Sequence, residues 1–141
     1  MSGIDFVADT NILVYLFDED NPDKKARAQM LLEEETAAGQ VLLSTQVLQE
    51  FYVAVTRKLG VPLSPEKAED VVCQLIMLPL VEINSRHILG AIARSRKLQY
   101  SFWDALIIEA AISGGAGILL TEDLQHGQTI GSLEIQNPFL A

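Results

Sequence analysis

Short apolar segments alternate along the chain with longer segments of helical periodicity. Segments 6–8, 41–43, 80–83 and 118–120 are mostly apolar, and each leads through polar residues into a helical pattern or a polar loop. Short buried runs of this kind are typical of strands covered on both faces, and their alternation with helices is typical of a parallel sheet. We therefore predict an α/β fold with a mostly parallel sheet and helices on both faces.

The predicted helices lie between these strands. Their periodicity places them at 12–17, 24–38, 47–59, 65–77, 86–98 and 105–112. Ser64 and Pro65 are suited to the N-cap and the first helical position of the fourth helix. Segment 105–112 is apolar on nearly every side and is expected to be buried. A further candidate strand lies near 133–135.

The chain of 141 residues has the length of one domain, and we find no internal repeat or linker, so we predict a single domain over 1–141. No apolar run approaches the roughly 18 residues of a membrane span, and we find no signal-peptide pattern. We interpret the single cysteine, Cys73, as a small buried hydrophobe within a helix. These features predict a cytoplasmic protein without membrane association.

Four acidic residues stand out by their positions. Asp9 and Asp123 follow the first and fourth predicted strands, while Glu50 and Asp104 lie near the beginnings of apolar helices. Because the carboxyl ends of parallel strands meet at one edge of a sheet, all four can converge there. None has a Lys or Arg beside it in the sequence, and charges near a core are costly unless they are paired or bound to a metal.

A cluster of carboxylates is suited to Mg²⁺ or Mn²⁺, which prefer oxygen ligands. One or two such ions can deprotonate a water and stabilise an in-line displacement at phosphorus, so no histidine base is needed. The two histidines, His87 and His126, lie in no motif. The net charge of −9 excludes a general nucleic-acid coat protein, but it is compatible with a nuclease whose carboxylates are offset by metal ions.

Other interpretations remain open for these acids. Asp9 and Asp104 can cap helices, Glu50 can lie on a solvated helix flank, and Asp123 can belong to a turn. A phosphatase or a phospho-accepting receiver domain also uses Mg²⁺ and carboxylates, but a receiver needs a second acid at the first strand and a lysine near the last strand. No lysine follows Lys97. The non-enzymatic alternative is a scaffold that binds RNA or protein without cutting.

Four segments resemble, in order and spacing, the compact PIN-domain nucleases that include VapC-type toxins. They are Asp-Thr-Asn-Ile-Leu at 9–13, Gln-Glu-Phe at 49–51, Trp-Asp-Ala-Leu-Ile at 103–107 and Thr-Glu-Asp-Leu at 121–124. Together they cover nearly the whole chain. The resemblance implies a three-layer α/β/α sandwich and a Mg²⁺- or Mn²⁺-dependent endoribonuclease.

The resemblance also assigns roles to individual residues. It implies that four carboxylates hold the metal ions or their waters, with the second acting directly or through water: Asp9, Glu50, Asp104 and Asp123. Asn11 and Thr121 match small polar positions that hydrogen-bond the carboxylates or the attacking water. We interpret Thr10 as a helix cap and leave Glu122 and Glu109 out of the site.

The resemblance implies a biological role as well. It is that of the toxin of a type II toxin–antitoxin pair, acting on RNA as a homodimer and inhibited by a small antitoxin whose C-terminal segment covers the acidic site. We interpret Trp103, where the family often has Tyr or Phe, as a core residue in preference to one that stacks on a base. Five basic residues are candidates for binding a phosphate backbone, although a solvated helix end is the slightly favoured interpretation for any one of them: Arg57, Lys58, Arg94, Arg96 and Lys97.

Overall fold

The computed structural model describes residues 4–140 of the chain. Within these residues a sheet has the strand order β3-β2-β1-β4-β6-β5. All neighbouring strands are parallel except β5 and β6, which form an antiparallel pair. The strands are β1 Phe6–Ala8, β2 Val41–Ser44, β3 Leu80–Val81, β4 Ile118–Leu120, β5 Thr129–Ile130 and β6 Leu133–Gln136.

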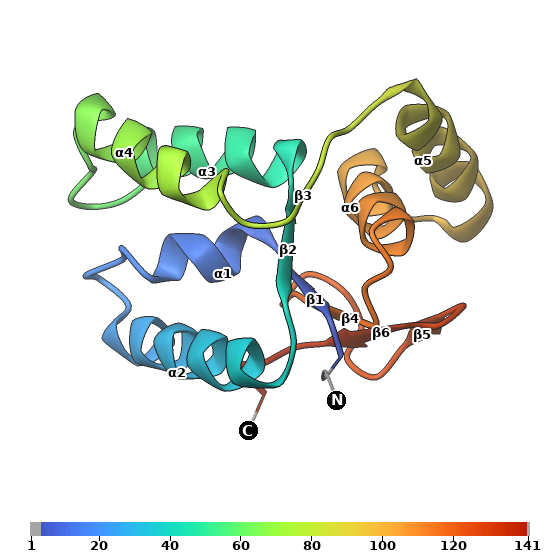
Figure 1. Ribbon diagram of the computed structural model, residues 1–141, viewed down its shortest axis with the longest axis horizontal. Helices are drawn as coiled ribbons and strands as arrows, with labels where there is room; N and C mark the ends of the chain where they lie inside the picture. Colours follow the sequence, from blue (N-terminus) through green and yellow to red (C-terminus); the bar gives the residue numbers. More distant parts are fainter. Residues whose placement is uncertain (1–3, 141) are drawn as a thin grey trace.

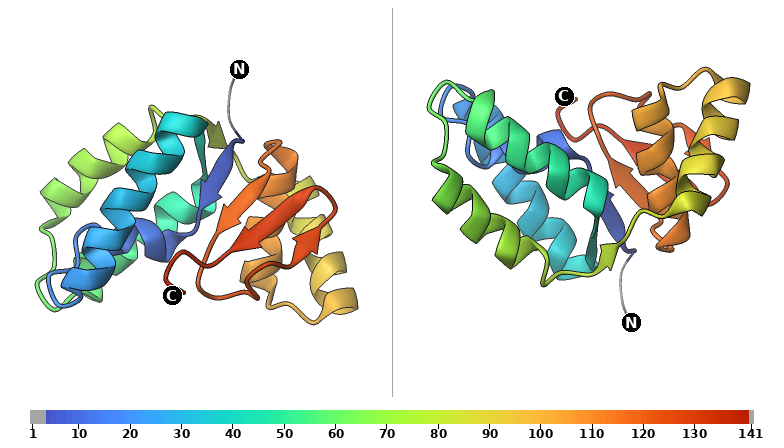
Figure 2. Two further views of the ribbon diagram at one scale, coloured as in Figure 1. Left: turned by 90° about the horizontal axis from the view of Figure 1, so that it is seen from below. Right: turned by 90° about the horizontal axis from the view of Figure 1, so that it is seen from above.

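Helices cover both faces of this sheet. They are α1 Thr10–Tyr15, α2 Pro22–Ala38, α3 Thr45–Arg57, α4 Pro65–Leu75, α5 Ser85–Leu98 and α6 Phe102–Ser113. Helices α1 to α4 lie on one side of the sheet, and α5 and α6 pack together on the other (Figures 1 and 2). This arrangement confirms the predicted α/β/α sandwich with a mostly parallel sheet.

The core lies between these layers. Every residue of β1, β2 and β4 is buried, as expected for central strands covered on both faces. Phe51 of α3 and Ile108 of α6 are fully buried. Six of the eight residues in segment 105–112 of α6 are buried, which confirms the expectation drawn from their apolar composition.

The structure departs from the predicted elements in a few places. Strand β5 was not predicted, because its two residues are too few to show a pattern and neither is buried. Helices α1 and α6 begin two and three residues before their predicted starts, immediately after the capping residues Asp9 and Ser101. The prediction for Cys73 was wrong, because this residue is exposed on α4, whose one fully covered position is Ala68.

Among residues 4–140, no helix combines the length and apolar character that crossing a bilayer requires.

Candidate active site

The site begins where β1 and β4 end side by side. Their register pairs Ala8 with Leu120, so the next residues, Asp9 and Thr121, also lie together. Thr121 Oγ1 donates a hydrogen bond of 2.7 Å to Asp9 Oδ2, and Asp9 Oδ1 accepts one of 2.7 Å from the backbone N–H of Thr10. Both carboxylate oxygens of Asp9 are therefore held by neutral donors, and one of them caps α1.

Thr10 has a different role from the predicted one. Asp9 is the N-cap of α1, and the Thr10 hydroxyl reaches across to α3, where Oγ1 donates a hydrogen bond of 2.7 Å to Glu50 Oε1. The interpretation of Thr10 as a helix cap was therefore wrong. Its buried side chain instead fixes a carboxylate from a distant part of the sequence.

Helix α3 contributes one face to the site. It begins directly after β2, with Ser44 as its N-cap. Residues four apart on an α-helix lie on one face, and Gln46, Glu50, Ala54 and Lys58 follow this spacing. Gln46 Nε2 lies 3.4 Å from Glu50 Oε2, so Glu50 receives donors from its own helix and from Thr10.

The two remaining acids come from α6 and from the loop after β4. Asp104 lies in the first turn of α6, and its backbone N–H donates to the Ser101 hydroxyl at 3.1 Å. Asp123 is exposed, and its backbone N–H donates to Thr121 Oγ1 at 3.1 Å. Asn11 Nδ2 lies 3.5 Å from Asp123 Oδ2, at the outer limit of a hydrogen bond.

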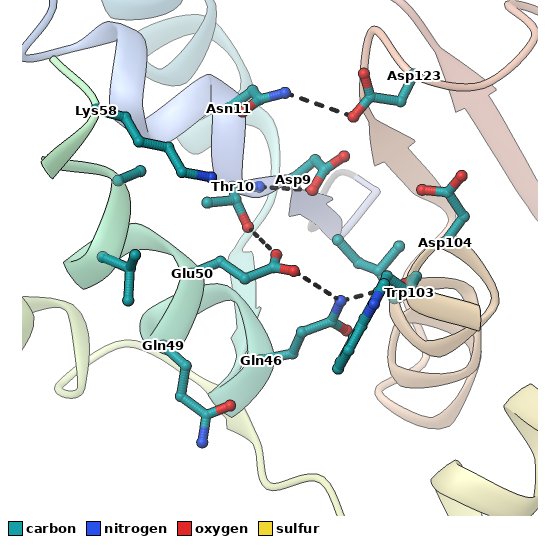
Figure 3. A pocket seen from close by; sticks show the side chains of 13 residues that line it. Asp9, Thr10, Asn11, Gln46, Gln49, Glu50, Lys58, Trp103, Asp104 and Asp123 are labelled. Carbon is teal, nitrogen blue, oxygen red and sulfur yellow. Dashed lines mark hydrogen bonds between the residues drawn. The ribbon is translucent and has the colours of Figure 1, made fainter. Parts of the chain in front are cut away.

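These elements enclose one pocket of about 590 Å³. All four predicted acids line it, and their side chains face one another across it in Figure 3. Asn11 also lines the pocket, while Thr121 reaches it through its hydrogen bond to Asp9. The structure thus brings the six predicted site residues together. The pocket lining is Asp9, Thr10, Asn11, Gln46, Gln49, Glu50, Val53, Ala54, Lys58, Trp103, Asp104, Ile107 and Asp123.

The acids influence one another electrostatically. The pKa of Asp9 is raised to about 6: burial is the largest cause, the hydrogen bonds from Thr121 and Thr10 oppose it, and the nearby charges of Asp123 and Glu50 add to it. The pKa of Asp123 is also raised, first by the partial desolvation of this exposed residue and then by the charges of Asp104 and other neighbouring acids. The pocket therefore disfavours the ionised forms of Asp9 and Asp123 unless positive charge enters.

The chemistry of the donor set fits a hard divalent cation. The lining offers four carboxylates and no soft thiolate or imidazole ligand, and Mg²⁺ and Mn²⁺ favour oxygen donors. Within residues 4–140, however, no three His, Cys, Asp or Glu side chains stand close enough to form a ready-made metal centre. The carboxylates share one pocket without already being gathered around one point.

The neighbouring acids that were left out of the site form ion pairs elsewhere. Glu122 accepts a hydrogen bond from Lys24 Nζ at 2.8 Å, and Glu109 accepts one from Arg94 Nε at 2.8 Å. In contrast, none of the four pocket acids forms an ion pair with another residue in the range 4–140. Among the described residues, the basic side chain that lines the pocket is that of Lys58.

Two lining residues differ from the sequence interpretation. Trp103 was interpreted as a core residue, but 60% of its surface is exposed at the pocket, so that interpretation was wrong. Gln46 was not considered, although its position four residues before Glu50 places it on the same helix face. That spacing is the signal from which it was predictable.

The fold is shared with several solved structures. A toxin–antitoxin complex from Klebsiella pneumoniae contains a chain that matches with a TM-score of 0.69 and 19% identity, covering 94% of this chain and 97% of that one. VapC20 of Mycobacterium tuberculosis, described as a Sarcin-Ricin loop cleaving toxin, matches with a TM-score of 0.65 and 16% identity over 81% and 86% of the two chains. VapBC2 of Rickettsia felis, bound to a promoter DNA fragment, matches with a TM-score of 0.63 and 21% identity over 95% and 98%.

Sequence comparison gives the family. No curated protein sequence matches the chain at a significant level. The family profile described as PIN domain matches residues 6–129, which include Asp9, Glu50, Asp104 and Asp123. The same residues that meet in the pocket therefore lie within the matched region, and the chain belongs to the PIN-domain family.

Proposed function

We propose that this chain is a Mg²⁺- or Mn²⁺-dependent endoribonuclease that hydrolyses phosphodiester bonds in single-stranded or looped RNA. The observation that carries the proposal is the convergence of four carboxylates, from four separate elements, on one pocket. Membership of the PIN-domain family supports it, and so does the fold likeness to VapC20, which is described as a Sarcin-Ricin loop cleaving toxin.

In this proposal four side chains would hold one or two cations: Asp9, Glu50, Asp104 and Asp123. When bound, such a cation supplies an activated water and stabilises negative charge on the phosphate oxygens. The chain's own contribution is to position the ligands. Thr121 holds Asp9 and Thr10 holds Glu50, each through a hydrogen bond of 2.7 Å. Such supporting contacts fix the orientation of a ligand.

Lys58 would bind a substrate phosphate beside these carboxylates. It is exposed, it extends into the pocket in Figure 3, and it forms no ion pair with another described residue. An ammonium group in this position attracts the phosphate backbone and offsets part of the repulsion from the acids. It is the basic residue that the structure favours among the candidates drawn from the sequence.

We further propose that the protein is the toxin of a type II toxin–antitoxin pair in the cytoplasm, working as a homodimer with a small antitoxin. The sequence resemblance to VapC-type toxins supports this role. The neighbouring solved structures include toxin–antitoxin complexes, which also supports it. Induced expression is expected to arrest bacterial growth, and expression of Asp104→Asn is expected not to.

The decisive experiment is cleavage of a structured RNA such as tRNA by the purified protein. We expect discrete cuts with Mn²⁺ or Mg²⁺, none with EDTA, and none from the Asp104→Asn variant. Glu109→Gln is the matched control, because it makes the same kind of change on the same helix but in a residue paired with Arg94. Equal cutting by Asp104→Asn would contradict the assigned site, and RNA binding without cutting under any metal would favour a scaffold.

A further inference from the structure

Two groups in the pocket have no part in holding the proposed cations: the indole ring of Trp103 and the amide oxygen of Gln46. We propose that they form a subsite for one unpaired nucleotide beside the carboxylates. The base stacks on Trp103, and a hydrogen-bond donor of the same nucleotide binds Gln46 Oε1. This inference rests on the proposed ribonuclease function and specifies how that site takes its substrate.

The amide of Gln46 is oriented by two acceptors. Nε2 donates to the backbone oxygen of Trp103 at 3.2 Å and to Glu50 Oε2 at 3.4 Å. Both partners only accept, so the amide cannot be reversed without two repulsive contacts. Oε1 is consequently fixed as a buried acceptor, and it has no partner among the described residues.

An unpaired buried acceptor is an uncommon and costly feature in a folded protein. Gln46 is only 5% exposed, and it lines the pocket between Glu50 and Trp103 (Figure 3). Because the described residues supply no donor, this oxygen can accept from a molecule that enters the pocket, either water or a ligand that displaces it. A nucleotide has two kinds of suitable donor, the ribose 2′-hydroxyl and the N–H groups of its base.

The indole ring of Trp103 is available to that molecule. Tryptophan is highly buried on average, but this one is 60% exposed in the first turn of α6, directly before Asp104. Its aromatic contact is edge-to-face with Phe102, with centroids 5.1 Å apart and an interplanar angle of 78°. Unpaired bases bind proteins by stacking on aromatic faces of this kind.

The surroundings favour a nucleotide over an apolar protein segment. The ring adjoins a pocket lined by four carboxylates, and a purely apolar partner would desolvate them without compensation. A nucleotide places its flat base on the indole and directs its phosphate toward Lys58 and any cation on the carboxylates. The pocket volume of about 590 Å³ lies within the range of about 300 to 1,000 Å³ that is usual for small-ligand sites.

Trp103 is also the reporter for the test, because it is the one tryptophan of the chain. The Asp9→Asn variant, chosen to prevent cutting, would be titrated in Mg²⁺ with a short single-stranded oligoadenylate. We expect saturable quenching of Trp103 fluorescence. An abasic ribose–phosphate oligomer of the same length is expected to bind weakly and to leave the fluorescence unchanged. Equal quenching by both oligomers, or binding without quenching, would overturn the proposal.

Substitution of the ring tests stacking by a second measurement, the polarisation of a labelled oligoadenylate. Trp103→Ala is expected to weaken binding about 5- to 150-fold, the range of base stacking on an aromatic side chain. Trp103→Phe is expected to restore most of the affinity. Tyr52→Ala is the matched control, because Tyr52 is an exposed aromatic residue of α3 outside this pocket. Unchanged affinity in Trp103→Ala would contradict the stacking.

Gln46→Leu tests the hydrogen bond. We expect a loss of about 2- to 10-fold in affinity for oligoadenylate, as for one hydrogen bond. If the donor is the 2′-hydroxyl, the loss disappears when the DNA oligomer of the same sequence is used; if the donor is the base, it disappears with the abasic oligomer. An equal loss with all three oligomers would show that Gln46 only supports Glu50, and this part of the proposal would fail.

The readouts separate this inference from the proposed function. A protein that cuts no RNA but shows base-dependent quenching retains the nucleotide subsite and is not a nuclease. A protein that cuts RNA without any response of Trp103 is a nuclease whose substrate does not stack on this ring, and the inference fails. Concentration-dependent self-association that buries Trp103 and leaves quenching absent would identify the ring as a protein-contact surface and overturn the inference.

Discussion

Replacing Asp9 with asparagine is expected to stabilise the EDTA-treated protein against unfolding. Burial raises the pKa of this carboxyl from 3.8 to about 6, so the folded state binds its proton more tightly than the unfolded state does. As the pH rises through this interval, the ionised form is disfavoured only in the folded protein. Its ionisation therefore lowers the free energy of unfolding as the pH increases.

The magnitude follows from the shift in pKa. A difference of about 2.2 pKa units corresponds to about 3 kcal/mol, reached in full above the folded-state pKa. By the same relation the cost is about 1.6 kcal/mol near pH 5 and about 3 kcal/mol near pH 8. Asparagine removes the charge but keeps an oxygen that can cap α1 through the N–H of Thr10.

Urea unfolding in EDTA at these two pH values measures the effect. We expect Asp9→Asn to have the higher free energy of unfolding, with an advantage that grows from pH 5 to pH 8. Glu33→Gln is the matched control, because it makes the same chemical change on an exposed face of α2. A variant that is less stable than the wild type at pH 8, or an advantage that shrinks with increasing pH, would refute the reasoning.

Three further outcomes are expected. Mn²⁺ at about a hundred times its dissociation constant should stabilise the wild type by about 2.7 kcal/mol in a thermal-shift measurement, and Asp104→Asn should lose most of this gain. Lys58→Ala should weaken RNA binding and lower the slope of log affinity against log salt by about one, whereas Lys97→Ala, outside the pocket, should not. Thr10→Val should lower the free energy of unfolding by about 1.5 to 3 kcal/mol, because Glu50 loses its 2.7 Å donor and a hydrogen bond to a charged group contributes about this much. An unchanged free energy of unfolding would contradict the role of Thr10 in holding Glu50.

The layered fold was predictable because its central strands are buried on both faces and show this in their composition. In the sequence, strands β1, β2 and β4 are short, mostly apolar segments, and each is followed by a polar residue. Strand β5 has no such signature, because it is a two-residue edge strand that exists through its pairing with β6. Its formation depends on a partner and not on its own residues.

The convergence of the four acids was predictable for a different reason. In a parallel sheet, residues that follow the carboxyl ends of strands lie at the same edge of the sheet. This places the acids on one side of the molecule but does not give the distances between them. Which polar residue takes which partner was not predictable in the same way. Asp9 and Thr10 are both good capping residues; in the structure Asp9 caps α1, and the Thr10 hydroxyl donates to Glu50, forty positions away in the sequence.

Exposure on apolar helices was the property that the sequence described least well. Helix α6 is apolar on nearly all sides, so periodicity does not distinguish Trp103 in its first turn from the buried residues that follow. The exposure of each residue depends on how far the neighbouring elements cover α6, and the first turn of this helix lines the pocket. Cys73 was misjudged for a different reason, because α4 packs along a narrow face that includes Ala68, and Cys73 lies off that face.

The distribution of ion pairs reconciles the net charge of −9 with the proposed action on RNA. The structure neutralises Glu122 with Lys24 and Glu109 with Arg94, although both acids lie close in sequence to the site motifs. It provides no such partner, among residues 4–140, for the four acids of the pocket. Beyond the part that Lys58 offsets, their charge is then balanced from solution, so cations and the RNA phosphate should bind together. It follows that RNA affinity should rise with Mg²⁺ in the wild type. A variant with both Asp104→Asn and Asp123→Asn should bind RNA more tightly than the wild type does in EDTA. The same variant should not cleave RNA when Mg²⁺ is present.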